Sequence, residues 1–262
     1  LLTVVPLIVV ISLFYFRSTD IIETKIRNTN NQTLVETADK IDGMLKLVEQ
    51  KTNQLTKDIS ITKILRNDLD QTVHALQPDE RKRYLSELVA ALNAEVESDD
   101  MIDAVYVFNN EGFVYASTGA QPVTSFLALK YVAHQMPRTL SWANFIDHAR
   151  PASAVEIMDD LTDKKLGIIA VMLKPDKFKE SFASYPYGTF YITNSSDMIL
   201  SAHDPALVGE RLKPASASAD NIINTRTSFY SGFTYYSIVP KRVLNHEIED
   251  LAYYAAAITV AA

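Results

Sequence analysis

The sequence carries one strand pattern twice, and this repeat constrains the fold more than any other feature. Residues 105–117 (VYVFNNEGFVYAS) and residues 190–202 (FYITNSSDMILSA) each contain an apolar strand, a polar turn and a second strand. That order of segments predicts a β-hairpin in each copy. Aligning the copies places Gly112 on Asp197, and both residue types tolerate the positive φ of a tight turn.

A second repeated element follows each hairpin. Gly167 and Pro175 bracket a strand-like run in the first copy, and Gly232 and Pro240 bracket one at the same separation in the second. Each proline opens a segment that reads as a helix, where its missing N–H needs no partner. The chain is therefore expected to contain the same module twice, in an α+β fold with two tandem antiparallel sheets.

A long helix is predicted to precede the two modules. Residues 17–73 contain no proline and a single glycine, Gly43. Two series of mostly apolar residues recur every seven positions within it: Leu34, Ile41, Val48, Leu55 and Ala38, Leu45, Thr52, Ile59. Such a pattern forms an apolar stripe along the helix. The stripe either packs against the chain's own domains or forms a homodimer seam through this helix, and both hold if they use different faces.

Both ends of the sequence are apolar. Residues 1–16 (LLTVVPLIVVISLFYF) carry no charge and are followed by Arg17, which predicts the end of a first transmembrane helix. Residues 251–262 (LAYYAAAITVAA) place two tyrosines where an interfacial aromatic belt is expected, so they predict the start of a second span. We therefore expect a cell-membrane protein whose residues 18–250 fold outside the cytoplasm.

The composition excludes several classes of function. The net charge of −7 argues against nucleic-acid binding by this segment, and the absence of cysteine excludes thiol catalysis, disulfides and cysteine-based zinc sites. Ser201, His203 and Asp204 are close in sequence, but a catalytic triad needs its members to converge in space. No HExxH or GxSxG motif is present either. We therefore expect no catalytic residues, no cofactor and no bound metal.

Two segments of the second module resemble a known family. They are residues 190–209 (FYITNSSDMILSAHDPALVG) and residues 232–244 (GFTYYSIVPKRVL). With the long helix and the repeat, they are similar to the double Cache (dCache) sensor domain, the PAS-like extracytoplasmic fold of bacterial receptors. The resemblance implies a ligand-sensing segment that is not itself an enzyme, with a cytoplasmic histidine kinase or AraC-type DNA-binding regulator as output. The sequence looks most like the sensors of Firmicute kinases and AraC-type regulators.

The repeat and the resemblance together predict five segments. Residues 1–17 end transmembrane helix 1, residues 18–76 form the long signalling helix, residues 77–184 form a membrane-distal PAS-like module, residues 185–250 form a membrane-proximal PAS-like module, and residues 251–262 start transmembrane helix 2. The distal module has the longer middle segment, so it has more material for the walls of a pocket. A small molecule of unknown identity is expected to bind there.

The middle of the distal module contains the only tryptophan, Trp142, with Arg138 and Asp147 nearby in sequence. An arginine binds a carboxylate, an aspartate binds an ammonium group and an aromatic ring covers the ligand, so these three residues are candidates for a zwitterion site. The alternative is that Trp142 belongs to the core and Arg138 is a solvated charge. Amino-acid-binding dCache domains carry an Arg-x-Trp-Tyr pattern, whereas RTLSW in this chain separates arginine from tryptophan by three residues.

Three further candidates lie on predicted strands and turns of the distal module. Tyr106 and Tyr115 lie on the first hairpin and are expected to contact the ligand, unless they are plain core residues. The turn before the last distal strand holds three carboxylates: Asp159, Asp160 and Asp163. Asp160 is the candidate ligand contact among them. The turn as a whole either binds a calcium ion or is a solvated hairpin loop, and it lacks EF-hand spacing.

A ligand in the distal module can signal only by binding two states of the protein with different affinities. The long helix and the helix after Pro240 are the expected moving elements, in a homodimer whose membrane spans pass the shift onward. The alternative is a segment that docks a partner protein, such as a solute-binding protein, and has no small ligand. Changing Trp142 and Arg138 discriminates, because a ligand pocket predicts a lost response with an intact fold.

Overall fold

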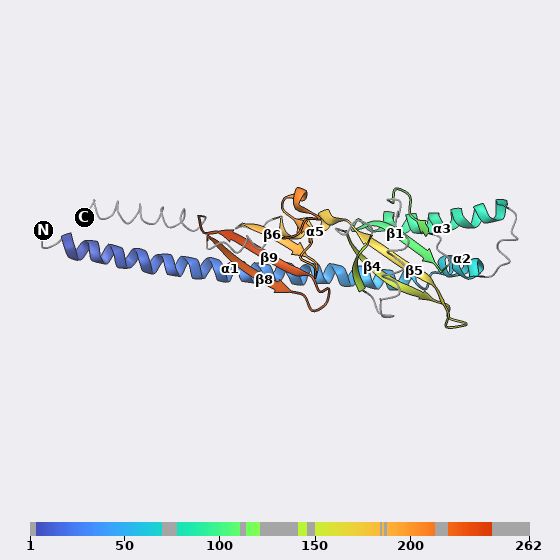
Figure 1. The fold of residues 1–262 in the computed structure, drawn as a ribbon, viewed down its shortest axis with the longest axis horizontal. Coiled ribbons are helices and arrows are strands. Elements are labelled where there is room, and N and C mark those ends of the chain that lie inside the picture. The colour runs from blue at the N-terminus through green and yellow to red at the C-terminus, as the bar shows by residue number, and fades with distance from the viewer. Residues whose placement is uncertain are drawn as a thin grey trace.

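The computed structural model shows an elongated molecule built along one helix. It describes residues 4–69, 78–110, 114–120, 141–145, 150–183, 185, 188–212 and 220–242. Helix α1 (Val4–Leu55) runs along most of the length, and two antiparallel sheets lie beside it one after the other (Figure 1). The predicted α+β fold, with one long helix and two tandem sheets, is confirmed.

The long helix ends earlier than the sequence predicts. After α1 there is a short break, and a separate helix, α2 (Ile59–Leu69), begins. Asp58 causes this restart, because its Oδ1 accepts hydrogen bonds from the backbone N–H groups of Ser60 at 2.7 Å and Ile61 at 3.2 Å. That is the geometry of a helix N-cap. The prediction of an unbroken helix to residue 73 is therefore wrong.

The apolar stripe of α1 packs inside the chain. All but one of its predicted members are buried: Leu34, Ala38, Ile41, Leu45, Val48, Thr52 and Leu55. Most of them join residues of both sheets in one core cluster. The exception, Ile59, starts α2 and is 79% exposed. The interpretation that the stripe packs against the chain's own domains is confirmed, so a homodimer through α1 must use the opposite, exposed side of the helix.

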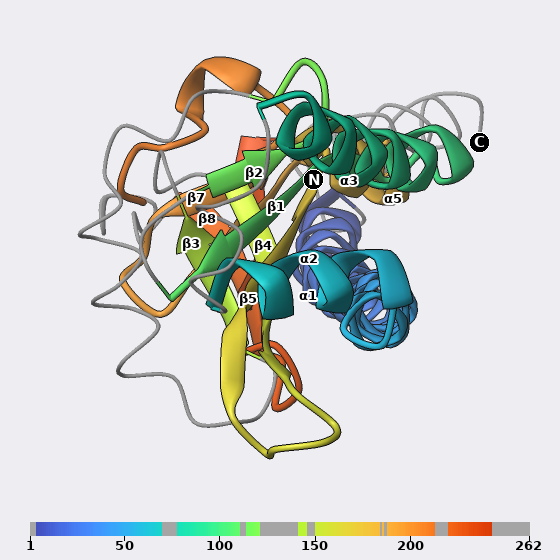
Figure 2. The same ribbon diagram turned by 90° about the vertical axis from the view of Figure 1, so that its right-hand side faces the viewer.

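Sheet A, which belongs to the module predicted to be membrane-distal, has five strands. They are β1 (Ile102–Asn109), β2 (Val114–Ala116), β3 (Ser141–Phe145), β4 (Arg150–Met158) and β5 (Lys165–Leu173). In space their order is β2-β1-β5-β4-β3, and every neighbouring pair is antiparallel. α1, α2 and α3 (Pro78–Ser98) cover one face of this sheet (Figure 2). Helix α5 (Pro175–Phe182) follows β5, as the repeated proline predicts.

Sheet B, which belongs to the module predicted to be membrane-proximal, has four strands. They are β6 (Thr189–Thr193), β7 (Ile199–Ala202), β8 (Asn221–Thr227) and β9 (Thr234–Pro240). Their order, β7-β6-β9-β8, matches that of sheet A without β3. Both predicted hairpins are present, and Asp197 has the positive φ, 59°, expected at the second turn. The repeat in the sequence is therefore a repeat of topology.

The second half of the repeat aligns differently from the sequence prediction. Gly167 lies inside β5, where an added Cβ would be 2.2 Å from a β1 carbonyl oxygen, whereas Gly232 precedes β9 in a turn with φ of 71°. Strand pairing makes Ala170 of β5 correspond to Tyr236 of β9, because each lies opposite the hairpin tyrosine of its own sheet. Equal spacing from glycine to proline matches Ala170 to Tyr235 instead. The predicted alignment is wrong by one residue, and such a slip moves a side chain to the other face.

Two predicted segments fall partly or wholly outside the described residues. They are the helix after Pro240, described only as far as residue 242, and the second span at residues 251–262. Within the described part of the chain, no helix has an apolar stretch of the length required to cross a bilayer. Sheet A with α5 ends at Phe182 and sheet B begins at Thr189, while the predicted segment boundaries stay predictions.

Candidate ligand-binding face of the distal sheet

The two faces of sheet A carry different side chains. The face toward the helices holds buried β-branched residues: Val105, Val107, Ile157, Ile169 and Val171. They belong to the main core, and the strands that carry them contact α1, α2 and α3 (Figure 2). Branched side chains on a pleated surface fill a close-packed layer, so the helix side of the sheet is structural.

We call the opposite side of sheet A the outer face. It consists of eight buried side chains, four of them alanine: Ala104, Tyr106, Phe108, Ala152, Ala154, Ile168, Ala170 and Met172. A methyl group reaches only a short way above a sheet, whereas a layer packed on a sheet lies about 10 Å away. Because these side chains are buried in the chain alone, protein atoms already fill the space above the alanines, and a ligand that binds there must take the place of some of them.

Tyr106 lies at the centre of the outer face. The strand register places it in one row with Ala116 on β2, Ala170 on β5 and Ala154 on β4. Its ring stacks on Phe108, with ring centroids 6.2 Å apart and planes 14° from parallel. An aromatic pair flanked by alanines makes a flat apolar wall, which is the usual lining of a small-molecule site.

One edge of the outer face is polar. Glu156 lies in the same strand row as Phe108 and Ile168, and its Oε1 is 2.5 Å from Nζ of Lys165. The Glu156 side chain is 16% exposed. A partly buried ion pair beside an apolar wall offers both signs of charge to the polar end of a ligand.

The two tyrosines predicted as ligand contacts lie on opposite faces of sheet A. Tyr106 is buried on the outer face. Tyr115 pairs with Val107 across the hairpin and packs against the core on the helix side. Hairpin register decides the face that each side chain takes, so the structure brings only Tyr106 to the outer face.

The remaining predicted ligand contacts are Trp142, Arg138 and Asp147. β3 pairs Trp142 with Ser153, and the next residue in that row, Val171 on β5, faces the helices. The register therefore does not put Trp142 in the row of Tyr106. Arg138 and Asp147 lie outside the described residues, so the proposed zwitterion site stays a prediction.

The acidic turn between β4 and β5 is built around one carboxylate. Asp159 accepts hydrogen bonds from Thr162 Oγ1 at 2.8 Å, the Leu161 N–H at 3.1 Å and Arg66 Nη2 at 2.6 Å. These contacts, led by the one from Thr162, hold the pKa of Asp159 below its usual value. The predicted ligand residue Asp160 is exposed in this turn and does not belong to the outer face. Among the described residues, no three histidine or carboxylate side chains are arranged to hold a metal ion.

The neighbouring Ser201, His203 and Asp204 have separate structural roles. Ser201 is buried within sheet B. The His203 ring lies 5.2 Å from that of Phe182 on α5. Asp204 caps a short 3-10 helix, η2 (Pro205–Leu207), and so starts a turn as the sequence predicts. Each of the three side chains is therefore accounted for by packing or capping.

The corresponding face of sheet B is filled differently. Its row across β7, β6, β9 and β8 is Ala202, Tyr191, Tyr236 and Thr225. Tyr191 and Tyr236 are half-buried, and Thr225 is exposed. The proximal sheet thus holds a tyrosine ring at the position where the distal sheet holds Ala170.

The alanines are candidate site residues that the sequence predictions did not include. In the β4 run, Ala152 and Ala154 alternate with Ser153 and Val155, and this two-residue period is visible in the sequence. Small residues on one face of a strand also suit the close approach of another segment. Only the burial of these alanines away from the helices identifies them as candidates for a ligand site.

Neither a protein-family profile nor a curated protein sequence matches the chain. Solved structures do. The sensor domain of the V. cholerae histidine kinase DctB aligns with a TM-score of 0.62 at 13% identity, covering 83% of this chain and 98% of that one. The ligand-binding domain of the Pseudomonas fluorescens chemoreceptor CtaA, in complex with L-isoleucine, gives 0.59 at 15% identity, with 88% and 99% covered. That of the Campylobacter jejuni chemoreceptor Tlp3, in complex with L-valine, gives 0.54 at 12% identity, with 87% and 97% covered.

These likenesses concern the fold. The chain shares its fold with these sensor and ligand-binding domains along nearly the whole length of each structure, so the fold implied by the resemblance in the sequence is confirmed. The narrower resemblance to sensors of Firmicute proteins stays a prediction.

Proposed function

We propose that this chain is the extracytoplasmic sensing domain of a bacterial transmembrane receptor, and that it binds a small molecule on the outer face of sheet A. The support is a fold shared with sensor domains, a buried face rich in alanine, and the apolar ends of the sequence. The receptor lies in the cell membrane and carries a cytoplasmic histidine kinase or AraC-type regulator as its output. The sensing segment itself catalyses no reaction.

The observation that carries the proposal is the difference in side-chain volume between the two faces of sheet A. The helix side uses valine and isoleucine, while the outer face has alanine at four buried positions. A face that only receives a second core layer gains stability from large side chains, since each missing methylene of a buried residue costs about 1 kcal/mol. Small side chains on this face instead suit a site in which the ligand takes the place of the groups that now bury the alanines.

The outer face favours a ligand with an apolar body and one polar end. Its large side chains are Tyr106, Phe108, Ile168 and Met172. Its charged groups lie at one edge, where Glu156 and Lys165 form an ion pair. The L-isoleucine and L-valine in two of the similar structures are molecules of this description. Arg138 and Asp147 are proposed to contact the polar end of the ligand, and Trp142 is proposed as a contact only at the sheet edge formed by β3, away from the row of Tyr106.

Transmission of the signal is proposed to use α1, because this helix contacts both sheets. A ligand that binds one arrangement of the distal module more tightly shifts the population toward that arrangement. In a homodimer formed through the exposed side of α1, a small displacement of the helix would pass to both membrane spans.

A thermal-shift screen tests the proposal. The chain of residues 1–262, in detergent, is heated with amino acids, organic acids, sugars, purines, polyamines and calcium. A ligand at about 100 times its Kd adds about 2.7 kcal/mol, which raises the Tm by a few degrees. Each hit is then tested on Ala154→Leu, which fills the outer face, and on Thr225→Leu, which makes a similar change at the matching position of sheet B.

A ligand on the outer face and a ligand elsewhere predict opposite results. If the outer face binds the ligand, Ala154→Leu abolishes the shift in a folded protein, while Thr225→Leu keeps the shift. If the ligand binds elsewhere, Ala154→Leu costs about 1–3 kcal/mol through overpacking but keeps the shift, and the proposal fails. Alanine variants of Trp142, Arg138 and Asp147 then test the predicted contacts, each being expected to reduce the shift in a folded protein.

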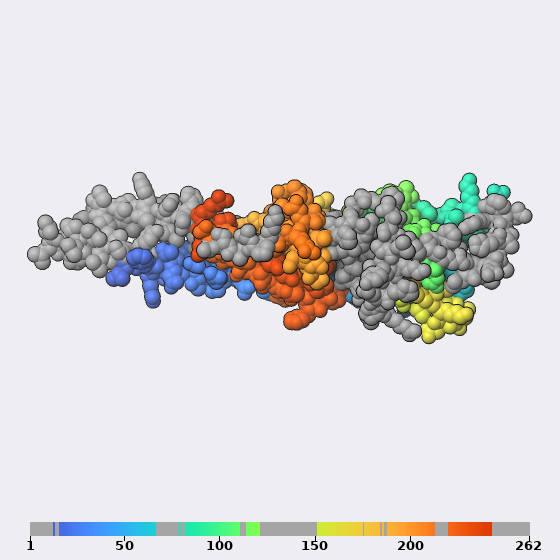
Figure 3. All heavy atoms as spheres, viewed as in Figure 1, coloured from blue at the N-terminus to red at the C-terminus, as the bar shows by residue number. Residues whose placement is uncertain are grey.

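A second candidate function is the docking of a partner protein such as a solute-binding protein. Two exposed apolar side chains favour it: Phe229, fully exposed in the β8–β9 turn, and Leu161, 80% exposed in the β4–β5 turn. The two turns project from the same side of the molecule (Figure 3). A silent ligand screen on folded protein, with signalling lost in Phe229→Ser and Leu161→Ser, would favour docking over ligand binding.

A further inference from the structure

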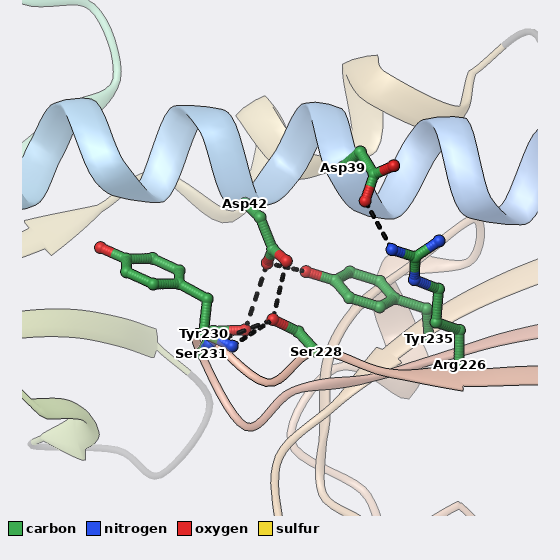
Figure 4. A network of polar contacts seen from close by, with 7 residues as sticks. All are labelled: Asp39, Asp42, Arg226, Ser228, Tyr230, Ser231 and Tyr235. Carbon is green, nitrogen blue, oxygen red and sulfur yellow. Dashed lines mark hydrogen bonds and ion pairs between the residues drawn. The ribbon is translucent and has the colours of Figure 1, made fainter.

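Asp42, near the middle of the part of α1 that lies beside the sheets, gathers three hydroxyl groups from the β8–β9 hairpin (Figure 4). Ser228 Oγ donates to its carboxylate at 2.7 Å, the Tyr235 hydroxyl at 2.9 Å and Ser231 Oγ at 3.4 Å. We call these four residues the Asp42 cage. Hydrogen bonds to an ionised acceptor are about twice as strong as neutral ones, so the cage is a strong attachment of the helix to the hairpin.

Contacts on the neighbouring turns of α1 extend this attachment. One turn earlier, Arg226 of β8 lies 2.6 Å from Asp39 (Figure 4). One turn later, Nζ of Lys46 lies 5.3 Å from the centroid of the Tyr230 ring. The hairpin therefore contacts three successive turns of the helix, and the cage is the middle one.

The cage donors are oriented before they meet the carboxylate. Ser228 Oγ accepts the backbone N–H groups of Tyr230 at 3.0 Å and Ser231 at 3.1 Å, so its own hydrogen is left for Asp42. Tyr235 is completely buried. Burial, with the negative charge of Asp42, raises the pKa of Tyr235 well above its usual value, so its hydroxyl remains a donor at any physiological pH.

The cage differs in kind from the apolar part of the α1 interface. The buried stripe of the helix packs through apolar side chains such as Leu34, Ile41 and Leu45. Apolar contact is non-directional and tolerates a small slide of one element past another. A hydrogen bond loses most of its strength when its geometry is displaced by about 1 Å. The cage, with the Arg226–Asp39 ion pair and the hydrogen bond from Asn224 Nδ2 to the Arg27 carbonyl oxygen at 3.4 Å, therefore specifies where α1 lies along sheet B, and only the cage joins three hydroxyl groups to one carboxylate.

Tyr235 connects the Asp42 cage to the last strand of sheet B. It lies on β9, the last strand of the sheet, which runs back beside the early part of α1, where Ile26 meets Ile222 and Val239. We propose that the Asp42 cage fixes the axial position of α1 relative to β9, so that the two elements move as one unit when the distal module changes state. Asp42 is thus a coupling residue that touches no ligand, and the proposal does not depend on which ligand binds.

The test measures the α1–β9 position far from the cage. The chain has no cysteine, so spin labels are placed by Lys25→Cys and Lys241→Cys, both at exposed positions. Lys25 lies about 25 Å along the helix from Asp42, so local loosening of the hairpin alone does not reach it. Label distances are measured by double electron–electron resonance in the unsubstituted background, in Asp42→Ala, and in Glu36→Ala as a matched exposed control on α1.

Asp42→Ala is expected to broaden the Lys25–Lys241 distance distribution or to add a second population, while Glu36→Ala leaves it unchanged. Amide exchange at Tyr230 and Ser231 should also accelerate by about tenfold or more, because their turn loses its charged anchor. If Asp42→Ala does not fold, the Ser228→Ala and Tyr235→Phe pair removes two of the three donors and takes its place. An unchanged distance distribution in the folded cage variant overturns the proposal, and so does an equal change in Glu36→Ala.

Discussion

The outer faces of the two sheets share one plan and differ in what fills them. Across four matched strands, sheet A reads Ala116, Tyr106, Ala170, Ala154 and sheet B reads Ala202, Tyr191, Tyr236, Thr225. The first two positions are identical. On the central strand, however, a buried alanine in one sheet corresponds to a half-buried tyrosine in the other.

The comparison teaches that duplicating a topology does not duplicate its site. Both sheets use the same strand order and pack one face on α1. On the proposed function, the capacity for a ligand depends on the side chains at one or two positions of the other face, which the fold leaves free to vary. Exchanging those side chains between the sheets is therefore the sharpest way to test the comparison.

The largest effect is expected from Ala170→Tyr, which gives sheet A the residue of sheet B. A ring inserted at the centre of the outer face should reduce the affinity for a ligand found by the screen by about 100-fold or more, because a close-packed site cannot accommodate it. Isothermal titration calorimetry measures the loss. Tyr236→Phe, which removes only a hydroxyl from the matching position, serves as the control. If Ala170→Tyr leaves the affinity unchanged, the ligand does not bind on the outer face.

The reverse exchange, Tyr236→Ala, should affect stability and not binding. Because Tyr236 is half-buried, we expect a cost of about 1–2 kcal/mol, below the 3–5 kcal/mol of a fully buried ring. Urea unfolding measures the cost, and calorimetry should show unaltered ligand affinity. A loss of affinity here, with none in Ala170→Tyr, would move the site to the proximal module.

Each module also has one ion pair that attaches a helix to its sheet, and the two ion pairs can be compared. Arg66 and Asp159 attach α2 to the distal β4–β5 turn, and the Asp159 side chain is only 6% exposed. Arg226 and Asp39 attach β8 to α1, and the Asp39 side chain is 60% exposed. Removing Arg66 leaves a poorly solvated carboxylate, so Arg66→Ala should destabilise more than Asp39→Ala, whose cost should be at most about 1 kcal/mol. Equal urea midpoints for the two variants would contradict this ranking.

The smallest effect concerns pH and the junction of the modules. Burial beside Phe182, with the charge of Lys179, lowers the pKa of His203 below its usual 6.5. The unfolded chain then binds a proton more readily than the folded one, so the free energy of unfolding falls as pH drops below about 6.5 and levels off below the folded pKa. Thermal unfolding between about pH 7.5 and pH 5 should show a shallower acid decline in His203→Gln than in the unsubstituted protein. An identical decline would exclude His203 as the cause.

Much of the architecture could be predicted from local patterns. Both hairpins, the proline-opened helix α5 and the apolar stripe of α1 follow from periods of two and 3.6 residues. The break at Asp58 was missed because an N-cap aspartate inside a long apolar pattern resembles an ordinary surface residue. The alignment of β9 was wrong because spacing between glycine and proline does not specify hydrogen-bond register.

Less of the candidate site could be predicted. In the sequence, Tyr106 and Tyr115 are equally good candidates for a ligand contact, and only strand pairing places them on opposite faces. Ala154 and Ala170 carry no chemical signature of their own. They become candidates only when the helices are seen to occupy the other face, and that assignment depends on contacts between segments about 100 residues apart in sequence.

Residue type and patterns within a few turns of chain were enough to predict the hairpins, the duplication and the exclusion of thiol chemistry, but not the break between α1 and α2. The tertiary structure alone decided three things: that the α1 stripe is buried within the chain, that the outer face of sheet A is lined by alanine, and that Asp42 meets three hydroxyl groups of a hairpin some 190 residues away. Each of these depends on register and on long-range packing. Neither is encoded in any short window of the sequence, since both arise from burying many side chains at once.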